Sequence, residues 1–178
     1  MTLTSTSVSS QANAEHAKAD PSGKADSATP ARVLRQFRLV FNVVKTHFQQ
    51  VEKRVGVGGA QVWALHVVQQ RPGIGVHGLA RAMDVRQPTA SNLVRSLVDN
   101  GMLEVRKEGV DRRAVQLHVL APGLDVLKRA PGPFAGVLPQ ALAGLDAATL
   151  ERLEQDLGEL ISRLGADERA AGIPLAQM

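Results

Sequence analysis

Residues 87–101 read QPTASNLVRSLVDNG, and this stretch decides the fold. Pro88 suits the first turn of a helix, where its missing N–H would have no partner, and Gly101 after Asn100 is a helix stop. The apolar side chains between them recur at helical spacing and are expected to pack inward as one stripe. They are Ala90, Leu93, Val94, Leu97 and Val98. The stretch therefore predicts an amphipathic helix.

The other faces of this helix are mostly small and polar, and they carry Thr89, Ser91, Asn92, Arg95 and Ser96. Short hydroxyl and amide side chains let a helix backbone come close to DNA, and Asn and Arg match base edges or phosphates. Many solvated surface helices have the same composition, however. The flanking sequence has to decide between a DNA-reading helix and an ordinary surface helix.

A basic hairpin is predicted directly after the helix. Residues 103–107 and 115–119 each alternate between apolar and polar side chains, as half-buried strands do, and residues 108–111 form a turn between them. The tip carries Lys107, Arg112 and Arg113. Such a hairpin is a wing, and arginines on a wing can enter the minor groove, where the potential is most negative.

A short helix at 76–83 and a tight turn at 84–86 precede the central helix, so the order predicts a winged helix-turn-helix. Here the sequence closely resembles the MarR family of bacterial transcription regulators. The similarity extends from roughly Gln36 to Leu164. It rests on Leu79-Ala80, Thr89-Ala90-Ser91-Asn92-Leu93-Val94 through Leu97, Gly101-Met102-Leu103-Glu104-Val105-Arg106 and Asp111-Arg112-Arg113-Ala114.

The resemblance implies a mainly α fold with a small β-hairpin, in which dimerisation helices come from both chain ends. It also implies a homodimer that binds double-stranded DNA at a palindromic operator, represses transcription and is released by a small-molecule effector. Arg113 would enter the minor groove, and Asp111 would orient it. The expected DNA-binding residues are Gln87, Pro88, Thr89, Ser91, Asn92, Arg95, Arg106, Lys107, Asp111, Arg112 and Arg113.

Both ends of the chain carry helices with an apolar face. One runs from Ala31 to Val55. Another follows Asp146, a residue type that caps helix N-termini, and has leucines at alternating spacings of three and four. These faces are predicted to pair with those of a second copy. The expected dimerisation residues are Phe37, Val40, Phe41, Val44, Leu150, Leu153, Leu157, Leu160 and Leu164.

The predicted organisation is a disordered tail at 1–30, a MarR-type domain at 31–165 and a flexible C-terminal tail at 166–178. Within the domain, 57–121 forms the winged helix lobe, and 31–55 and 122–165 supply the dimerisation helices. The glycines at 56–59 form a linker before a helix at 60–70, and residues 74–76 are expected to form a short strand joining the hairpin. A Pro-Gly-Pro run at 131–133 breaks the helix that begins near Pro122, and the helix is expected to resume with Phe134. Leu120 stands where the family usually has a capping Thr, so this helix start is expected to lack one side-chain cap.

An effector site is expected near Trp63 and His66, which lie one turn apart off the main apolar stripe of their helix. By resemblance, this helix borders the region where such regulators bind small ligands, and the ligand would be a small aromatic or phenolic compound. His47 is a further candidate. Ordinary packing of these side chains is the alternative interpretation.

Composition bounds the possible functions. The chain of 178 residues has a net charge of +4 and a pI of about 10.0, which suits a nucleic-acid partner. It has no cysteine, which excludes disulfides, and no apolar run long enough for a membrane span. The N-terminus lacks the pattern of a secretory signal, so a cytoplasmic protein without a cofactor is expected.

Three alternative functions follow from the same residues. A metal-responsive regulator is disfavoured because none of the five histidines stands at short ligand spacing to another. An enzyme is disfavoured because the chain has no HExxH, GxSxG or Walker motif. A winged helix used only for protein contacts would not require the arginines at the wing tip.

Overall fold

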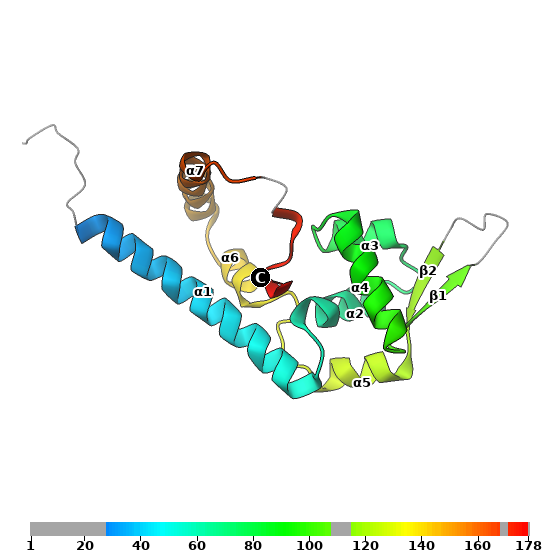
Figure 1. The fold of residues 1–178 in the computed structure, drawn as a ribbon. Coiled ribbons are helices and arrows are strands. Elements are labelled where there is room, and N and C mark those ends of the chain that lie inside the picture. The colour runs from blue at the N-terminus through cyan, green and yellow to red at the C-terminus, as the bar shows by residue number, and fades with distance from the viewer. Residues whose placement is uncertain (1–27, 108–114, 168–170, 178) are drawn as a thin grey trace, which may run out of the picture. The chain divides into compact units, whose positions relative to one another are not determined.

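The computed structural model describes residues 28–107, 115–167 and 171–177 (Figure 1). The chain divides into two units, Met1–Arg35 and Gln36–Met178, and the core lies in the second. The elements are α1 (Ala28–Val55), α2 (Gly59–Gln70), α3 (Val76–Ala82), α4 (Gln87–Asp99), β1 (Leu103–Lys107), β2 (Val115–Val119), α5 (Ala121–Arg129), α6 (Val137–Ala143), α7 (Ala147–Leu164) and the 3-10 helix η2 (Leu175–Gln177).

The predicted winged helix-turn-helix is confirmed. Helices α3 and α4 follow one another across a short turn, and the antiparallel hairpin of β1 and β2 comes directly after α4 (Figure 1). These elements share one core with α2 and α5. Its most deeply buried large side chains are Leu65, Leu79, Met83, Leu97, Leu103 and Leu117. The mainly α fold class with a small hairpin is therefore confirmed.

The hairpin is closed in a regular register, with Leu103 opposite Val119 and Lys107 opposite Val115. The short strand predicted at 74–76 is wrong, because α3 already begins at Val76. Two backbone hydrogen bonds still join this segment to β2: the Gly73 N–H donates to the Leu117 carbonyl at 3.0 Å, and the Leu117 N–H donates to the Ile74 carbonyl at 3.1 Å. The segment is a bridge to the hairpin and not a strand.

Phe48 of α1 packs against two glycines. A Cβ at Gly59, the first residue of α2, would collide with the Phe48 ring, and a Cβ at Gly136, just before α6, would lie 2.9 Å from Cζ of that ring. Gly136 also has a φ of +103°, which other residues rarely adopt. The glycine predicted as part of a linker at position 59 thus permits close contact between α1 and α2.

Three local predictions need correction. Helix α1 begins at Ala28, so residues 28–30 are helical and do not belong to a tail; residues 1–27 of that predicted tail lie outside the described residues. Val98 is not part of the buried stripe, because it lies at the stripe's edge and is exposed. Helix α6 begins at Val137 and not at Phe134, after a cis bond between Gly132 and Pro133.

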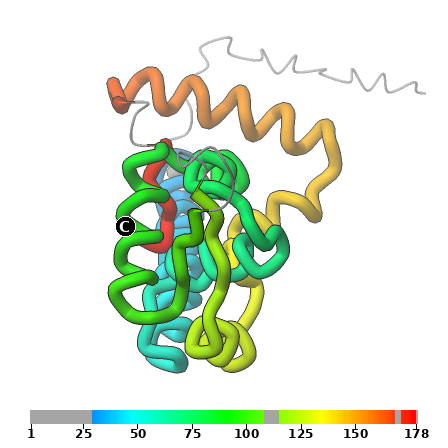
Figure 2. The backbone as a smooth tube through the Cα atoms, turned by 90° about the vertical axis from the view of Figure 1, so that its right-hand side faces the viewer, coloured from blue at the N-terminus to red at the C-terminus, as the bar shows by residue number. Residues whose placement is uncertain are grey.

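The flexible tail predicted for 166–178 is also corrected by the structure over part of its length. Residues 171–177, which we call the C-terminal strap, lie against α2 and α4 (Figures 1 and 2). Pro174 of the strap is buried, and Ala176 packs against the hydrophobic core. Among the described residues, every helix is too short or too polar to cross a bilayer.

Candidate nucleic-acid interface

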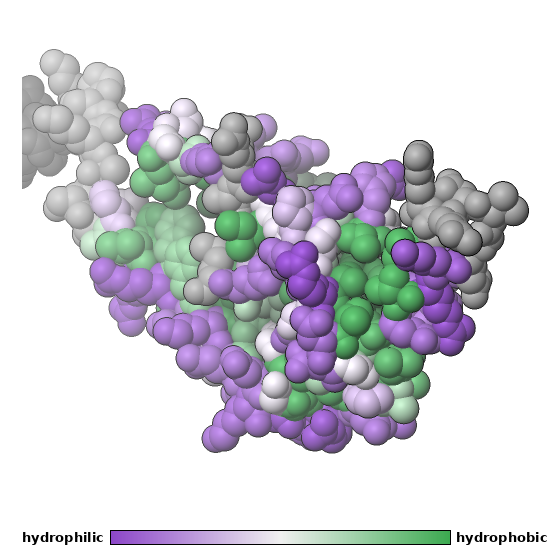
Figure 3. Space-filling view, turned by 45° about the vertical axis from the view of Figure 1, so that its right-hand side comes forward, coloured by the Kyte–Doolittle hydropathy of each residue, from purple (hydrophilic) through white to green (hydrophobic). Residues whose placement is uncertain are grey.

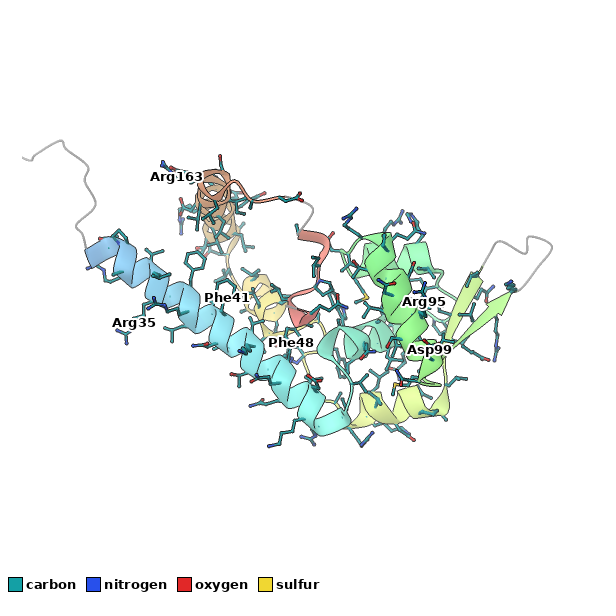
Figure 4. All side chains as sticks on the ribbon, viewed as in Figure 1. Arg35, Phe41, Phe48, Arg95, Asp99 and Arg163 are labelled. Carbon is teal, nitrogen blue, oxygen red and sulfur yellow. The ribbon has the colours of Figure 1, made fainter. Side chains whose placement is uncertain are left out.

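Helix α4 is held by one buried face. Ala90, Leu93, Val94 and Leu97 are buried in the core, as the spacing of the apolar residues predicted. The buried face fixes which side chains the helix presents outward. Gln87, Pro88, Asn92 and Arg95 are all exposed, and they come from the first three turns of the helix. Figure 4 shows Arg95 and Asp99 projecting from the same side of α4.

Two other predicted contact residues of α4, Thr89 and Ser91, are half-buried. The Thr89 hydroxyl donates a long hydrogen bond of 3.5 Å to the carbonyl of Gly172 in the C-terminal strap. Ser96 is likewise engaged, because its hydroxyl accepts a hydrogen bond of 2.7 Å from Nε2 of Gln61 in α2. The polar residues of α4 therefore divide into an outer face and an edge that already contacts the rest of the chain.

The N-terminus of α4 has no side-chain cap. Its N-cap residue is Arg86, and Pro88 sits in the first turn, where it removes one donor that would have no helical partner. The remaining N–H groups at a helix start attract acceptors and anions such as phosphate. Here the Arg86 N–H donates to the carbonyl of Gly172 at 3.3 Å. A carbonyl of the strap thus occupies a place suited to a phosphate oxygen.

The wing contributes positive charge from β1. Arg106 and Lys107 are both exposed, and Arg106 forms an ion pair with Glu104 of the same strand. That ion pair orients the Arg106 side chain, and in solvent it contributes little stability. The other predicted wing residues, Asp111, Arg112 and Arg113, lie outside the described residues, as does the turn at 108–111.

The three candidate effector residues do not come together in one site. Trp63 lines an apolar hollow of about 340 Å³ together with Phe48, Met83 and residues of the strap, whereas His47 and His66 are not among its lining residues. His47 is buried, and its Nε2 lies 3.1 Å from the Pro133 carbonyl. The rings of His66 and Phe134 lie 4.6 Å apart. These contacts give both histidines a role in packing.

The predicted dimerisation residues fall into two groups. Val44 is buried within the chain, and Phe37, Leu150, Leu153 and Leu157 are partly covered. The others remain exposed: Val40, Phe41, Leu160 and Leu164. No residue of α7 is buried, although the helix is strongly amphipathic in sequence. Apolar patches are also visible among hydrophilic residues on the face of the molecule drawn in Figure 3.

Sequence reasoning missed two features of this interface. Gln61 bonds to Ser96 across two helices, and nothing in the local pattern of either helix marks that pair. The strap contact at Gly172 was also missed. A glycine followed two residues later by a proline does signal a segment with special backbone geometry, but it does not say where the segment lies.

Within the described ranges, no group of three His, Asp or Glu residues could hold a metal ion.

Comparison with known proteins confirms the resemblance to the MarR family, whose sequence model matches residues 55–114. This range covers α2 through β1 and ends just before β2. The HTH-type transcriptional regulator PetP of Rhodobacter capsulatus is 27% identical over 95 residues, which cover 49% of this chain and 57% of PetP. A putative transcriptional regulatory protein for the hcr operon of Thauera aromatica is 34% identical over 65 residues, which cover 36% of this chain and 39% of that protein. The matched segments thus span 57% of the length of the first relative and 39% of the length of the second.

Solved structures support the fold. A MepR-like protein crystallised with pseudoligands superimposes with a TM-score of 0.53 at 16% identity, covering 80% of this chain and 100% of that one. The Staphylococcus aureus MepR protein in its DNA complex gives a TM-score of 0.52 at 18% identity, covering 79% of this chain and 99% of that one. At such low identity, the likeness extends to the fold and no further.

Proposed function

We propose that this chain is a transcription regulator that binds double-stranded DNA as a homodimer, with α4 in the major groove and Arg113 of the wing in the adjacent minor groove. The observation that supports this most is that the two faces of α4 differ. Four buried apolar residues anchor one face, and Gln87, Asn92 and Arg95 are exposed on the outward side. Amide and guanidinium groups on such a face match the donor and acceptor patterns of base edges. The curated relatives named as transcriptional regulators agree with this function.

The dimer is proposed from the apolar side chains that the chain leaves exposed. Val40 and Phe41 on α1 and Leu160 and Leu164 on α7 are exposed although they belong to long amphipathic helices. A second copy would cover them, with helices 31–55 and 122–165 forming the interface and the lobe 57–121 reading DNA. A two-fold dimer places two α4 helices about one DNA turn, roughly 34 Å, apart and requires a palindromic operator.

Repression relieved by a small effector completes the proposal. The hollow beside Trp63, at about 340 Å³, has a mostly apolar lining and the size of a site for a small aromatic acid or phenol. A ligand there would act by favouring a dimer geometry in which the two α4 helices have the wrong spacing. Trp63 is the single tryptophan of the chain, so its fluorescence reports such binding directly. A panel of aromatic acids that neither quenches Trp63 nor releases DNA would argue against this step.

The DNA interface is tested by removing single arginine charges inside and outside the proposed DNA-binding surface. Arg95→Ala and Arg113→Ala should each weaken binding to a selected operator by about 1–3 kcal/mol. Arg129→Ala is the matched control, because Arg129 is an exposed arginine at the end of α5, outside α4 and the wing. Affinity is measured by gel shift after selection of sites from random duplexes. Equal losses in all three variants would show that general charge, and not this face, binds DNA.

Asn92→Ala separates base reading from backbone contact. It should reduce the preference for the selected operator over random DNA more than it reduces binding to random DNA, because an amide that reads a base contributes little elsewhere. The ratio of the two affinities is the measurement. An equal loss of affinity for both duplexes would show that Asn92 contacts the DNA backbone and does not read a base.

A further inference from the structure

The C-terminal strap lies along the edge of the helix that is proposed to read DNA. The carbonyl of Gly172 accepts hydrogen bonds from the Arg86 N–H at 3.3 Å and from the Thr89 hydroxyl at 3.5 Å. Further along α4, a hollow of about 190 Å³ separates Asn92 and Ser96 from Ala176 and Gln177 of the strap. In Figures 1 and 2 the red strap runs beside the green α4. The strap therefore contacts the N-terminal turn of α4, and its 3-10 helix η2 packs against α2.

The strap is anchored by its own packing. Pro174 is buried, Ala176 packs against the core, and the Gln177 N–H closes a 3-10 turn by donating to the Pro174 carbonyl at 2.8 Å. The contact with α4 is close enough to require glycine at position 172. A Cβ there would collide with Cγ of Arg86 and lie 3.0 Å from its Cδ and 3.3 Å from its backbone nitrogen. The backbone of the strap thus fits against α4 without space for a side chain at 172.

The strap beside the start of α4 affects whether this helix can fit into a DNA major groove. The groove is about 12 Å wide and accepts a helix of about 10–12 Å diameter with its side chains. A polypeptide segment laid alongside adds about 5 Å, the spacing of neighbouring chains. Helix α4 with the strap docked is therefore too wide to enter the groove fully. The Gly172 carbonyl also occupies donors at the helix start that would otherwise be available to a phosphate oxygen.

We propose that the C-terminal strap, residues 171–177, is an intramolecular competitor of DNA, and that full insertion of α4 into the major groove requires the strap to leave. The docked strap lowers DNA affinity by the free energy needed to undock it. The proposed competitor of DNA is therefore a segment of this same chain, residues 171–177. The inference rests on the proposed function, because it presupposes that α4 enters DNA.

A reversible covalent lock tests this inference in one molecule. The chain has no cysteine, so the double variant Arg86→Cys, Gly172→Cys can form a single intrachain disulfide. Because a Cβ at 172 would touch Cγ of Arg86, one bond from the Cβ of residue 86, the two Cβ atoms lie near the roughly 3.5–4.5 Å that a disulfide spans. The reduced form of the same protein is the internal control for the loss of the Arg86 side chain.

The expected result is that the oxidised, full-length variant binds a duplex of about 30 base pairs at least about tenfold more weakly than the reduced form, and that reductant restores binding. Non-reducing gel electrophoresis reports the disulfide. Equal affinity of both forms, failure of the disulfide to form, or a disulfide-linked dimer would each overturn the inference. Absence of salt-dependent DNA binding by the reduced form and by the unmodified chain would instead overturn the proposed function.

A second variant acts in the opposite direction without a crosslink. Gly172→Val places a side chain against Arg86 and should displace the strap, which raises DNA affinity by about threefold or more. Ala171→Val is the matched control, because it adds similar bulk one residue away, at an exposed position of the strap. A Gly172→Val protein that remains folded by circular dichroism and shows the same DNA affinity as Ala171→Val would contradict the competition.

Discussion

The winged helix lobe and the terminal helices treat their apolar side chains in opposite ways. In the lobe, Leu65, Leu97 and Leu117 are completely buried by elements of the same chain. On α7, no residue is buried, and on α1 Phe41 is 58% exposed. Both regions have the amphipathic pattern of helices that pack. The difference teaches that an apolar stripe predicts burial but does not say which molecule supplies the partner.

The comparison also separates what each region contributes. The lobe holds α4 in place by side chains that need no second copy, so its surface is set within one chain. Exposed apolar area of the kind on α1 and α7 is costly in water, because burying it gains about 25 cal/mol per Å². We therefore expect the lobe to depend on core packing and the terminal helices to depend on protein concentration. The predictions that follow test this division, beginning with the largest effect.

Leu97→Ala should cost about 2–5 kcal/mol of the free energy of unfolding, because it empties space beneath a fully buried side chain of α4. Leu164→Ala, at a residue that is 70% exposed, should change it by no more than about 0.5 kcal/mol at concentrations where the chain is monomeric. Urea unfolding of both variants measures the difference. Equal costs would remove the contrast between the two regions.

Phe41→Asp should weaken self-association by about 2–4 kcal/mol while leaving the lobe folded, since it places a charge in the proposed apolar interface. That corresponds to a dissociation constant roughly 30- to 1000-fold higher. Sedimentation equilibrium over a range of concentrations is the measurement. Gln49→Asp adds the same charge at an exposed polar position of α1 and is the control. A wild-type chain that stays monomeric throughout would itself refute the dimer.

The same contrast explains how much could be predicted from sequence. The stripe of α4 was right at Ala90, Leu93, Val94 and Leu97, because a 3.6-residue period and a core on one side determine it. It was wrong at Val98, whose position at the edge of the stripe leaves burial to the surrounding elements. Local patterns therefore predict the elements well and their margins less well.

Contacts between distant parts of the chain were beyond prediction. The bonds from the Gly73–Ile74 segment to β2 involve backbone groups alone, so no side chain announces them. The strap, with its alanines, glycine and proline, has no periodic apolar face, and its place beside Arg86 depends on the absence of a Cβ at 172. The outward-facing residues of α4 could be predicted from the helix period alone, whereas the separation of His47, His66 and Trp63 depends on how the helices pack.

The smallest expected effect concerns the start of α7, which no buried residue stabilises. The Asp146 carboxylate accepts hydrogen bonds from the Thr149 N–H at 2.9 Å and from the Thr149 hydroxyl at 2.8 Å, and chiefly the first of these lowers the pKa of Asp146 below its ordinary value of 3.8.

A carboxyl whose pKa is lower in the folded state contributes stability that is present above the unfolded-state pKa and is lost as the pH falls through the folded-state value. The first turn of α7 should therefore loosen in acid, below the ordinary pKa of 3.8. The Thr149 amide resonance, followed by NMR from pH 6 to about pH 2, should titrate in the wild-type chain. In Asp146→Asn, whose amide oxygen can still cap the helix without titrating, it should stay nearly constant. A Thr149 resonance with the same titration in both proteins would show that α7 is held by a partner helix and not by its own cap.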